Sequence, residues 1–255
     1  MQNPSDMFEQ FRRLGLRAPE PALRALLQQL TKSRASPMET VEKLVALEWH
    51  EREGKNLKRR TRLATLGTFK PLDAFDWNHP KVIDRPLYEE LYALDFVDKA
   101  ENALLRGTSG LGKTMLAQNL GLAALTKGKT VLFTSLSWAL ADLLKQESIP
   151  AFERRLRRYL YPDLLILDEI GYVPFDSRSA DLLYNIISRR HEKRSTVITT
   201  NISFRQWGTI FPGAACVVAL VDRFVQHCHV LDIEGDSWRS KETDAPKTKG
   251  RKPKV

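Results

Sequence analysis

Residues 107–114 constrain this chain more than any other segment, because they read Gly-Thr-Ser-Gly-Leu-Gly-Lys-Thr. They fit the pattern G-x-x-x-x-G-K-[ST] at every fixed position. The glycines let the backbone curl so that several N–H groups face a chain of phosphates, while the lysine reaches the outer phosphates and the threonine hydroxyl ligates Mg²⁺. An apolar run precedes the pattern and a helix-like stretch follows it, which a chance match in a Gly-rich turn would lack. We therefore predict a nucleotide site formed by Gly107, Thr108, Ser109, Gly110, Leu111, Gly112, Lys113 and Thr114.

An acidic pair downstream is the second half of the predicted site. Residues 163–169 form an apolar run that is too short for a typical helix and ends in Asp168 and Glu169. A strand buried in a parallel sheet has this appearance when it delivers acids to the C-terminal edge of the sheet. We expect Asp168 to hold Mg²⁺ and Glu169 to polarise the attacking water. Adjacent residues on a strand point to opposite faces, so the two acids are expected to have different tasks.

Two later residues are further candidates. The β-branched run 195–201 ends at Asn201, whose amide is expected to contact the γ-phosphate or the attacking water. The alternative is a turn residue, because Asn favours strand ends. Arg223 lies too far along the chain for a role in the phosphate loop, but an arginine there can complete the site of a neighbouring subunit. The alternative for Arg223 is a pair with Asp222 in its own subunit.

The order of the elements predicts the fold class. After residue 67, strands alternate with helices, which indicates a three-layer α/β sandwich with a mainly parallel sheet. A chain of 255 residues can bury one such core and a small accessory unit. We expect a helical N-terminal domain that binds DNA or a partner over 1–66, an ATPase domain over 67–240 and a basic disordered tail over 241–255.

The N-terminal segment has helical spacing of its leucines and a capping box at 36–39. Met38, Val41, Val45 and Trp49 follow on one helix face, which we expect to be core against neighbouring helices. The basic run 58–62 is expected to contact nucleic acid or a partner. In the irregular joint 67–86, the apolar residues Leu72, Phe75 and Trp77 are expected to be core more than base-stacking surface.

The net charge of +9 lies at the two ends of the chain, because acidic and basic residues balance over 67–235. This distribution is typical of a module that holds an acidic polymer through its appendages, and plain solvated surface is the alternative. Four arginines in a predicted helix, 153–159, indicate a further surface that faces DNA or the assembly.

The composition also excludes some classes. There is no apolar run near 18 residues and the first residues are polar, so neither membrane insertion nor export is expected. Cys216 and Cys228 form no C-x-x-C pair, which favours a cytoplasmic protein with reduced thiols. We expect no metal at 227–229, because alternation along a strand would divide these side chains between two faces.

These segments and their order resemble the IstB-like transposition helper ATPases, a branch of the AAA+ superfamily close to DnaC-type helicase loaders and DnaA-type initiators. The resemblance covers nearly the whole chain. Beyond the phosphate loop, which identifies only the superfamily, it rests on the segments 70–77, 167–172, 187–192, 199–201 and 222–239.

The resemblance implies ATP and Mg²⁺ as cofactors, with Lys113 and Glu169 in catalysis, Asn201 as the first sensor and Arg223 as an arginine finger supplied in trans. Arg239 is similar to the family's C-terminal arginine near the nucleotide, although the chain ends too soon after it for the helical lid of many relatives. The partners implied are duplex DNA, a transposase and further copies of the chain, as dimers that build larger assemblies, with hydrolysis switching the assembly.

Two other functions stay open at this stage. A helicase loader would share the ATPase module and differ mainly in its N-terminal domain. A DNA scaffold that is gated by ATP but hardly hydrolyses it would not need Glu169, whose presence beside Asp168 argues against that alternative.

Overall fold

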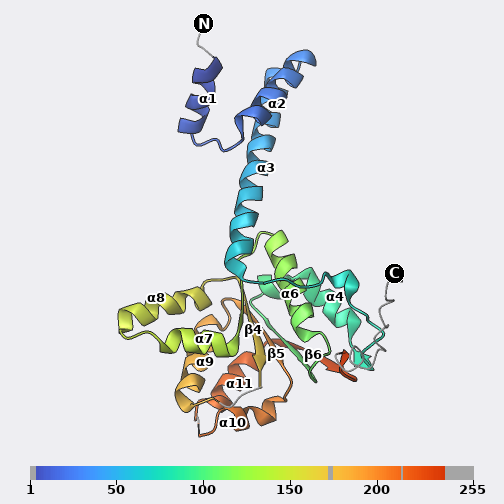
Figure 1. The fold of residues 1–255 in the computed structure, drawn as a ribbon, viewed down its shortest axis with the longest axis vertical. Helices are drawn as coiled ribbons and strands as arrows, with labels where there is room; N and C mark the ends of the chain where they lie inside the picture. Colours follow the sequence, from blue (N-terminus) through green and yellow to red (C-terminus); the bar gives the residue numbers. More distant parts are fainter. Residues whose placement is uncertain (1–3, 172–174, 214, 239–255) are drawn as a thin grey trace, which may run out of the picture. The chain divides into compact units, whose positions relative to one another are not determined.

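A computed structural model describes residues 4–171, 175–213 and 215–238 (Figure 1). The chain divides into two compact units between Arg62 and Leu63, inside the last turn of a long helix. Within the described ranges, none of the helices combines the length and the apolar composition needed to cross a membrane.

The N-terminal unit consists of helices α1 (Pro4–Arg13), α2 (Glu20–Lys32) and α3 (Pro37–Ala64). The hydroxyl of Ser36 accepts the N–H of Glu39 over 3.1 Å, so the predicted cap does begin α3. The core of the unit is small and contains Phe8, Ala18 and Leu23, against which Leu44 and Leu47 of α3 pack.

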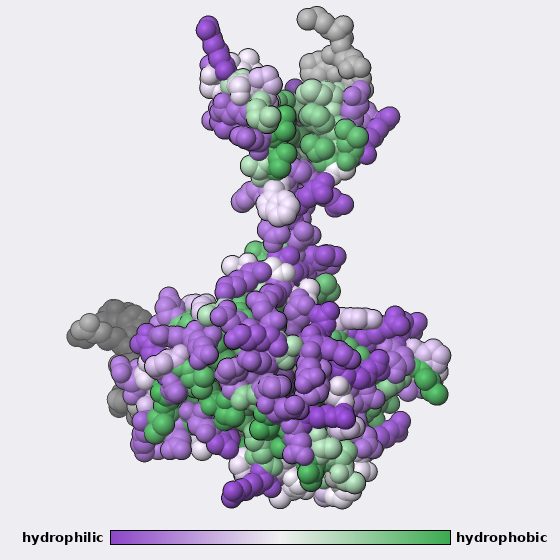
Figure 2. Space-filling model, turned by 180° about the vertical axis from the view of Figure 1, so that it is seen from behind, coloured by the Kyte–Doolittle hydropathy of each residue, from purple (hydrophilic) through white to green (hydrophobic). Residues whose placement is uncertain are grey.

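The expectation that Met38, Val41, Val45 and Trp49 are the core face of α3 is wrong, since these side chains are 55–72 % exposed. Two short helices can cover only one side of α3. The covered side carries Leu44 and Leu47, which pack against the small core. It also carries Glu48, whose carboxylate accepts the backbone N–H groups of two residues before α2. Apolar residues therefore gather on the surface of this unit (Figure 2).

The second unit is formed around a six-stranded sheet with the order β1-β6-β2-β5-β4-β3. Neighbouring strands are parallel except for β1 and β6, which are antiparallel. β5 lies between β2, which leads into the phosphate loop, and β4, which carries the acidic pair. The carboxyl ends of these three strands therefore meet at one edge of the sheet. The strands are β1 (Val82–Ile83), β2 (Asn102–Gly107), β3 (Val131–Ser135), β4 (Leu164–Ile170), β5 (Ser195–Thr200) and β6 (Cys228–Glu234).

Helices cover both faces of the sheet (Figure 1). α6 and α4 lie over one face, and α7 and α9 lie over the other, where α8 and α11 pack against α9. The predicted three-layer α/β sandwich with a mainly parallel sheet is confirmed, and helices precede it. The remaining elements are η1 (Leu72–Ala74), α4 (Arg85–Ala93), α5 (Asp95–Asp98), α6 (Lys113–Thr126), α7 (Leu136–Leu144), α8 (Ile149–Leu160), α9 (Ser177–Arg190), η2 (Phe204–Gln206), α10 (Trp207–Ile210) and α11 (Val217–Val225).

Arg190, the last residue of α9, ties three segments of this unit together. Its side chain is 1 % exposed. The guanidinium donates to carbonyl oxygens at the end of α8, in the connection to β4 and at the start of β5. Only arginine offers five donors in a fixed planar arrangement. The starts of β4 and β5 are thereby held together, and these strands deliver the candidate site residues at their other ends.

Candidate nucleotide-binding site

The phosphate loop connects the end of β2 to the start of α6, as the sequence predicts. Gly110 and Gly112 have φ of +82° and +81°, which L residues with a side chain rarely adopt. Both also lie in close contact with other segments. A Cβ at Gly110 would lie 2.1 Å from the Ser237 hydroxyl, and one at Gly112 would lie 2.7 Å from the ring of Phe75. Glycine at these two positions is therefore required by backbone conformation and by space.

Lys113 is the first residue of α6 and is 7 % exposed. Its ammonium group donates to the carbonyl oxygens of Gly107 and Thr108 over 2.7 and 2.8 Å. The start of α6 also presents backbone N–H groups that have no partner within the helix, together with the positive end of the helix dipole. A buried lysine beside a helix N-terminus fits a polyanionic ligand such as a chain of phosphates.

Thr114 and Asp168 come together from α6 and β4. The Thr114 hydroxyl donates to Asp168 Oδ1 over 3.1 Å, and the Thr199 hydroxyl donates to the same oxygen over 2.5 Å. Asp168 is 5 % exposed. Burial raises the pKa of its carboxyl, and the two hydroxyl donors oppose that rise. A hydroxyl and a carboxylate are the oxygen ligands that Mg²⁺ prefers, so this pair fits the predicted cation.

Glu169 lies in a β-bulge. Leu167 pairs with Ile198 and Ile170 pairs with Thr200, so β4 holds one more residue than β5 over this stretch. Glu169 has φ of +62°, and its N–H donates to the Thr199 hydroxyl over 2.9 Å.

The bulge interrupts the regular alternation of β4 at the acidic pair. Glu169 is exposed and lines the same cavity as Thr114, to which Asp168 is bonded. The expectation that the two acids lie on opposite faces rests on regular alternation, which the bulge interrupts, so their separate tasks stay a prediction.

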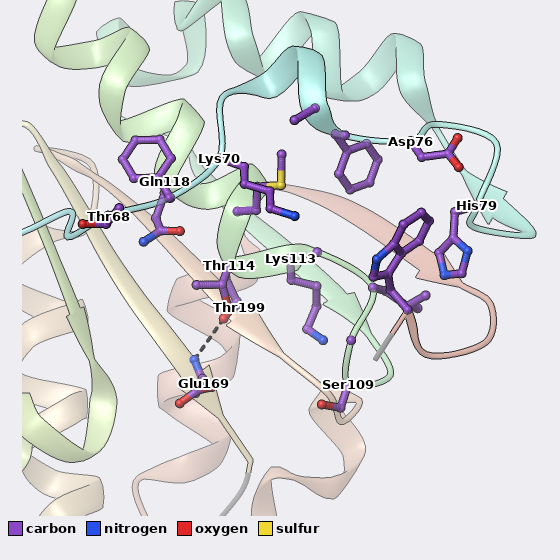
Figure 3. Close-up of a pocket in the computed structure, with 18 of the residues that line it drawn as sticks. Thr68, Lys70, Asp76, His79, Ser109, Lys113, Thr114, Gln118, Glu169 and Thr199 are labelled. Carbon is purple, nitrogen blue, oxygen red and sulfur yellow. Dashed lines mark hydrogen bonds between the residues drawn. The ribbon is translucent and has the colours of Figure 1, made fainter. Parts of the chain in front are cut away.

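A cavity of about 370 Å³ adjoins the phosphate loop (Figure 3). One end is lined by loop residues, Glu169 and Thr199, and the other by side chains from the joint and from the segment after β6. Phe75 lines this second end, so this aromatic residue is more than core, whereas Trp77 packs between Phe75 and Tyr88. A lining of aromatic and polar side chains fits the base of a nucleotide. The lining residues that sequence reasoning missed include Lys70, His79, Met115 and Trp238.

The segment after β6 is attached to the phosphate loop. The N–H of Trp238 donates to the Gly110 carbonyl over 3.1 Å, and the Thr108 hydroxyl donates to the Gly235 carbonyl over 3.3 Å. The rings of His79 and Trp238 meet edge to face at 4.6 Å. Arg239, which the family resemblance implies near the nucleotide, lies outside the described residues, as does the segment expected to lack a lid.

Asn201 and Arg223 do not line the cavity. Asn201 follows β5, and its Oδ1 is buried with no hydrogen-bond partner among the described residues. Arg223 is exposed on α11, with its guanidinium 5.0 Å from the ring of Tyr184. No ion pair joins it to Asp222 within the described part of the chain. Arg223 therefore makes no contact with the cavity of its own subunit.

The arginines of α8 divide into two kinds. Arg155 makes a bidentate pair with Asp142 of α7 at 2.6 Å, and Arg158 lies over the ring of Trp138. Arg154 and Arg157 are exposed. Hence only part of this basic helix presents charge to solvent.

The basic run of α3 is also divided. Arg60 pairs with Glu53 over 2.6 Å, while Lys58, Arg59 and Arg62 are exposed. These three lie at spacings of one, three and four residues, so they occupy neighbouring positions on the last two turns of the helix.

Solved structures with similar folds are DnaI (TM-score 0.52, 19 % identity, 66 % of this chain and 89 % of that chain) and DnaA from Aquifex aeolicus bound to AMPPCP (TM-score 0.51, 21 % identity, 64 % and 52 %). At these identities the likeness concerns the fold alone.

Relatives in sequence match most of the chain. A protein of Pseudomonas aeruginosa, named for insertion sequence IS21 and for inferred ATP binding, is 37 % identical over 86 % of this chain and 82 % of its own length. A protein of Bacillus thuringiensis subsp. berliner, named likewise for IS232, is 35 % identical over 80 % and 82 %. The family described as IstB-like ATP binding protein matches residues 9–245. The chain therefore belongs to the family of IstB-like ATP binding proteins.

Proposed function

We propose that this protein is an ATP-hydrolysing helper of transposition, which assembles on duplex DNA and stimulates a transposase. The proposal rests mainly on one observation: the structure brings together Lys113, Thr114, Asp168 and Glu169 at one edge of the sheet. In addition, the chain matches about four-fifths of the length of relatives that are named for insertion sequences. Those names favour transposition over helicase loading. We also propose a cytoplasmic location, where the DNA substrate of this function lies.

The site residues have separate tasks in hydrolysis. Bound Mg²⁺–ATP would supply the bond to be cleaved and the cation that neutralises its phosphates. Lys113 exchanges its carbonyl partners for phosphate oxygens, and the N–H groups of the loop and of α6 face the same phosphates. Thr114 and Asp168 hold the cation. Glu169, exposed to the cavity, orients the attacking water and accepts its proton. This use of Glu169 distinguishes a hydrolase from a scaffold that only binds ATP.

The site is completed by a second subunit in this proposal. Arg223 has no role in the cavity of its own chain, and its guanidinium is exposed on α11. An arginine that reaches the phosphates of a neighbouring subunit stabilises charge in the transition state and makes hydrolysis depend on assembly. Dimers and larger assemblies are then the active form, and hydrolysis is the switch that releases them. Asn201 is proposed as the sensor that approaches the phosphates when the site closes.

Duplex DNA is the proposed polymer because exposed cations lie on both units. Lys58, Arg59 and Arg62 are exposed on α3, and Arg154 and Arg157 are exposed on α8. Contacts of this kind bind phosphates without reading sequence. The N-terminal helices and the basic tail are proposed as the DNA-binding or partner-binding appendages of the ATPase unit.

The test is a strand-transfer assay with the transposase encoded by the same insertion sequence. We expect the wild-type protein to increase integration into a duplex target when ATP is present, and the Lys113→Ala variant to have no effect. ATP hydrolysis is measured in parallel, with and without duplex DNA. No stimulation of the transposase, together with hydrolysis that responds to a replicative helicase, would instead identify a helicase loader.

A further inference from the structure

Thr199, a buried residue of β5, contacts both acids of the site through one hydroxyl group. Its side chain is 1 % exposed. The hydroxyl donates to Asp168 Oδ1 over 2.5 Å. It also accepts the N–H of Glu169 over 2.9 Å, the bond drawn as a dashed line in Figure 3. A hydroxyl has a single O–H to donate, so its donor is used on one acid while its acceptor is used on the backbone of the other.

The contact with Asp168 fixes the orientation of that carboxylate. Oδ1 accepts from Thr199 on one side and from Thr114 on the other, so two donors from different elements limit rotation of the group. Thr114 and Asp168 are the residues that fit the cation. Thr199 therefore orients the Asp168 carboxylate, a predicted cation ligand, in the way that an outer hydrogen-bond partner orients a metal ligand.

The contact with Glu169 supports the bulge. A φ of +62° is unfavourable for a residue with a Cβ, and such a conformation persists only where the surrounding structure holds it. The bond to Thr199 is made by the N–H of this residue, at the position where β4 departs from regular pairing with β5. Glu169 lines the cavity from this bulge.

We propose that Thr199 is a positioning residue that couples the two acids, so that the cation ligands and the water-activating carboxylate keep one relative placement. The inference rests on the proposed ATP hydrolysis and adds to it a residue that is not among the predicted site residues. It implies that removal of one hydroxyl group disturbs both tasks, although Thr199 need not touch the nucleotide.

Thr196, a second buried threonine of β5, provides a matched control. Thr196 is also 1 % exposed, but its hydroxyl accepts from Arg190 Nε over 3.1 Å, at the opposite end of the strand. A Thr→Val change at either position retains shape and deletes one buried hydroxyl. Only the change at Thr199 removes contacts with the acids.

The first measurement is steady-state ATP hydrolysis by the full-length protein on duplex DNA. In Thr199→Val we expect turnover at saturating ATP to fall about 10- to 100-fold, the range found for outer partners of ligands, and KM for ATP to change little. Thr199→Ser should recover most of the turnover because it restores the hydroxyl. Thr196→Val should lose stability but keep its turnover.

The second measurement does not depend on turnover. The affinity of a fluorescent, non-hydrolysable ATP analogue is measured as a function of Mg²⁺ concentration. We expect the half-saturating Mg²⁺ concentration to rise about tenfold or more in Thr199→Val, and to stay unchanged in Thr196→Val. If Thr199→Val does not fold, Thr199→Ala is measured in the same two assays.

The outcomes separate this inference from the proposed function. If the wild-type protein hydrolyses ATP and Glu169→Gln does not, then wild-type turnover and Mg²⁺ dependence in Thr199→Val would overturn the role of Thr199 alone. Equal losses in Thr199→Val and Thr196→Val would also overturn it. An inactive wild-type protein would overturn the proposed hydrolysis itself.

Discussion

Arg190→Met tests the idea that one buried guanidinium holds β4 and β5 in place. Methionine has a similar length and no donor, so the change removes the hydrogen bonds while it retains most of the packing. Three acceptors that lose their donor lie in buried surroundings, namely the carbonyl oxygens of Tyr159 and Ser195 and the hydroxyl of Thr196. The other carbonyl partners are partly accessible and can recruit water.

The magnitude follows from these three acceptors. A buried polar group left without a partner costs about 1–3 kcal/mol, which gives roughly 3–9 kcal/mol for the set. The variant also removes a buried charge, which offsets part of this loss, so we expect the free energy of unfolding to fall by about 3–5 kcal/mol. That is a large fraction of the roughly 5–15 kcal/mol typical of a folded protein.

The assay is urea-induced unfolding followed by circular dichroism, with Arg189→Met as the matched control. Arg189 precedes Arg190 on α9, but it is exposed and makes a surface pair with Glu153 at 3.0 Å. Its loss should cost at most about 1 kcal/mol. If Arg190→Met is no less stable than Arg189→Met, the carbonyl cluster contributes little and the reasoning is refuted.

Four further predictions concern the site and its partners. Lys113→Ala should weaken ATP binding by about 10- to 100-fold or more, since a hydrogen bond to a charged group is worth about 1.5–3 kcal/mol; a folded variant with normal affinity in a nucleotide titration would exclude this loop. Gly110→Ala should also weaken binding in that titration, because its Cβ would lie 2.1 Å from the Ser237 hydroxyl, and unchanged affinity would contradict the close contact. DNA affinity, followed by fluorescence anisotropy, should fall with salt with a log–log slope of about −0.9 per contacted phosphate, and a flat response would refute a role for the exposed cations. Arg223→Ala should bind ATP without hydrolysing it, and a mixture with Lys113→Ala subunits should regain some activity; no recovery would remove the trans mechanism.

The phosphate loop and the parallel sheet could be predicted from the sequence because their signals are local. Gly107 to Thr114 have fixed spacing, and β4 is a short apolar strand with two adjacent acids near its end. Each signal depends on a few adjacent residues, and the alternation of strands and helices then leaves one fold class.

Other features depend on contacts between distant segments. The bulge at Glu169 depends on how β4 pairs with β5. No residue type within 163–170 indicates its position. The end of the cavity away from Glu169 is lined by Phe75, His79 and Trp238, which come from two irregular segments far apart in the chain. The apolar stripe of α3 shows the same difficulty, because periodicity identifies an apolar face but not whether a neighbour covers it.

The central claim is that Glu169 activates the water that hydrolyses ATP, and the Glu169→Gln variant tests this claim most directly. Glutamine retains the size of the side chain but cannot accept the proton of the attacking water, and loss of a general base typically lowers the rate by about 10²–10⁴-fold. The measurement is ATP hydrolysis on duplex DNA together with the amount of ATP retained by the DNA-bound protein. We predict hydrolysis reduced to this extent and ATP retained on a stable DNA-bound assembly, whereas wild-type turnover in Glu169→Gln would contradict the account.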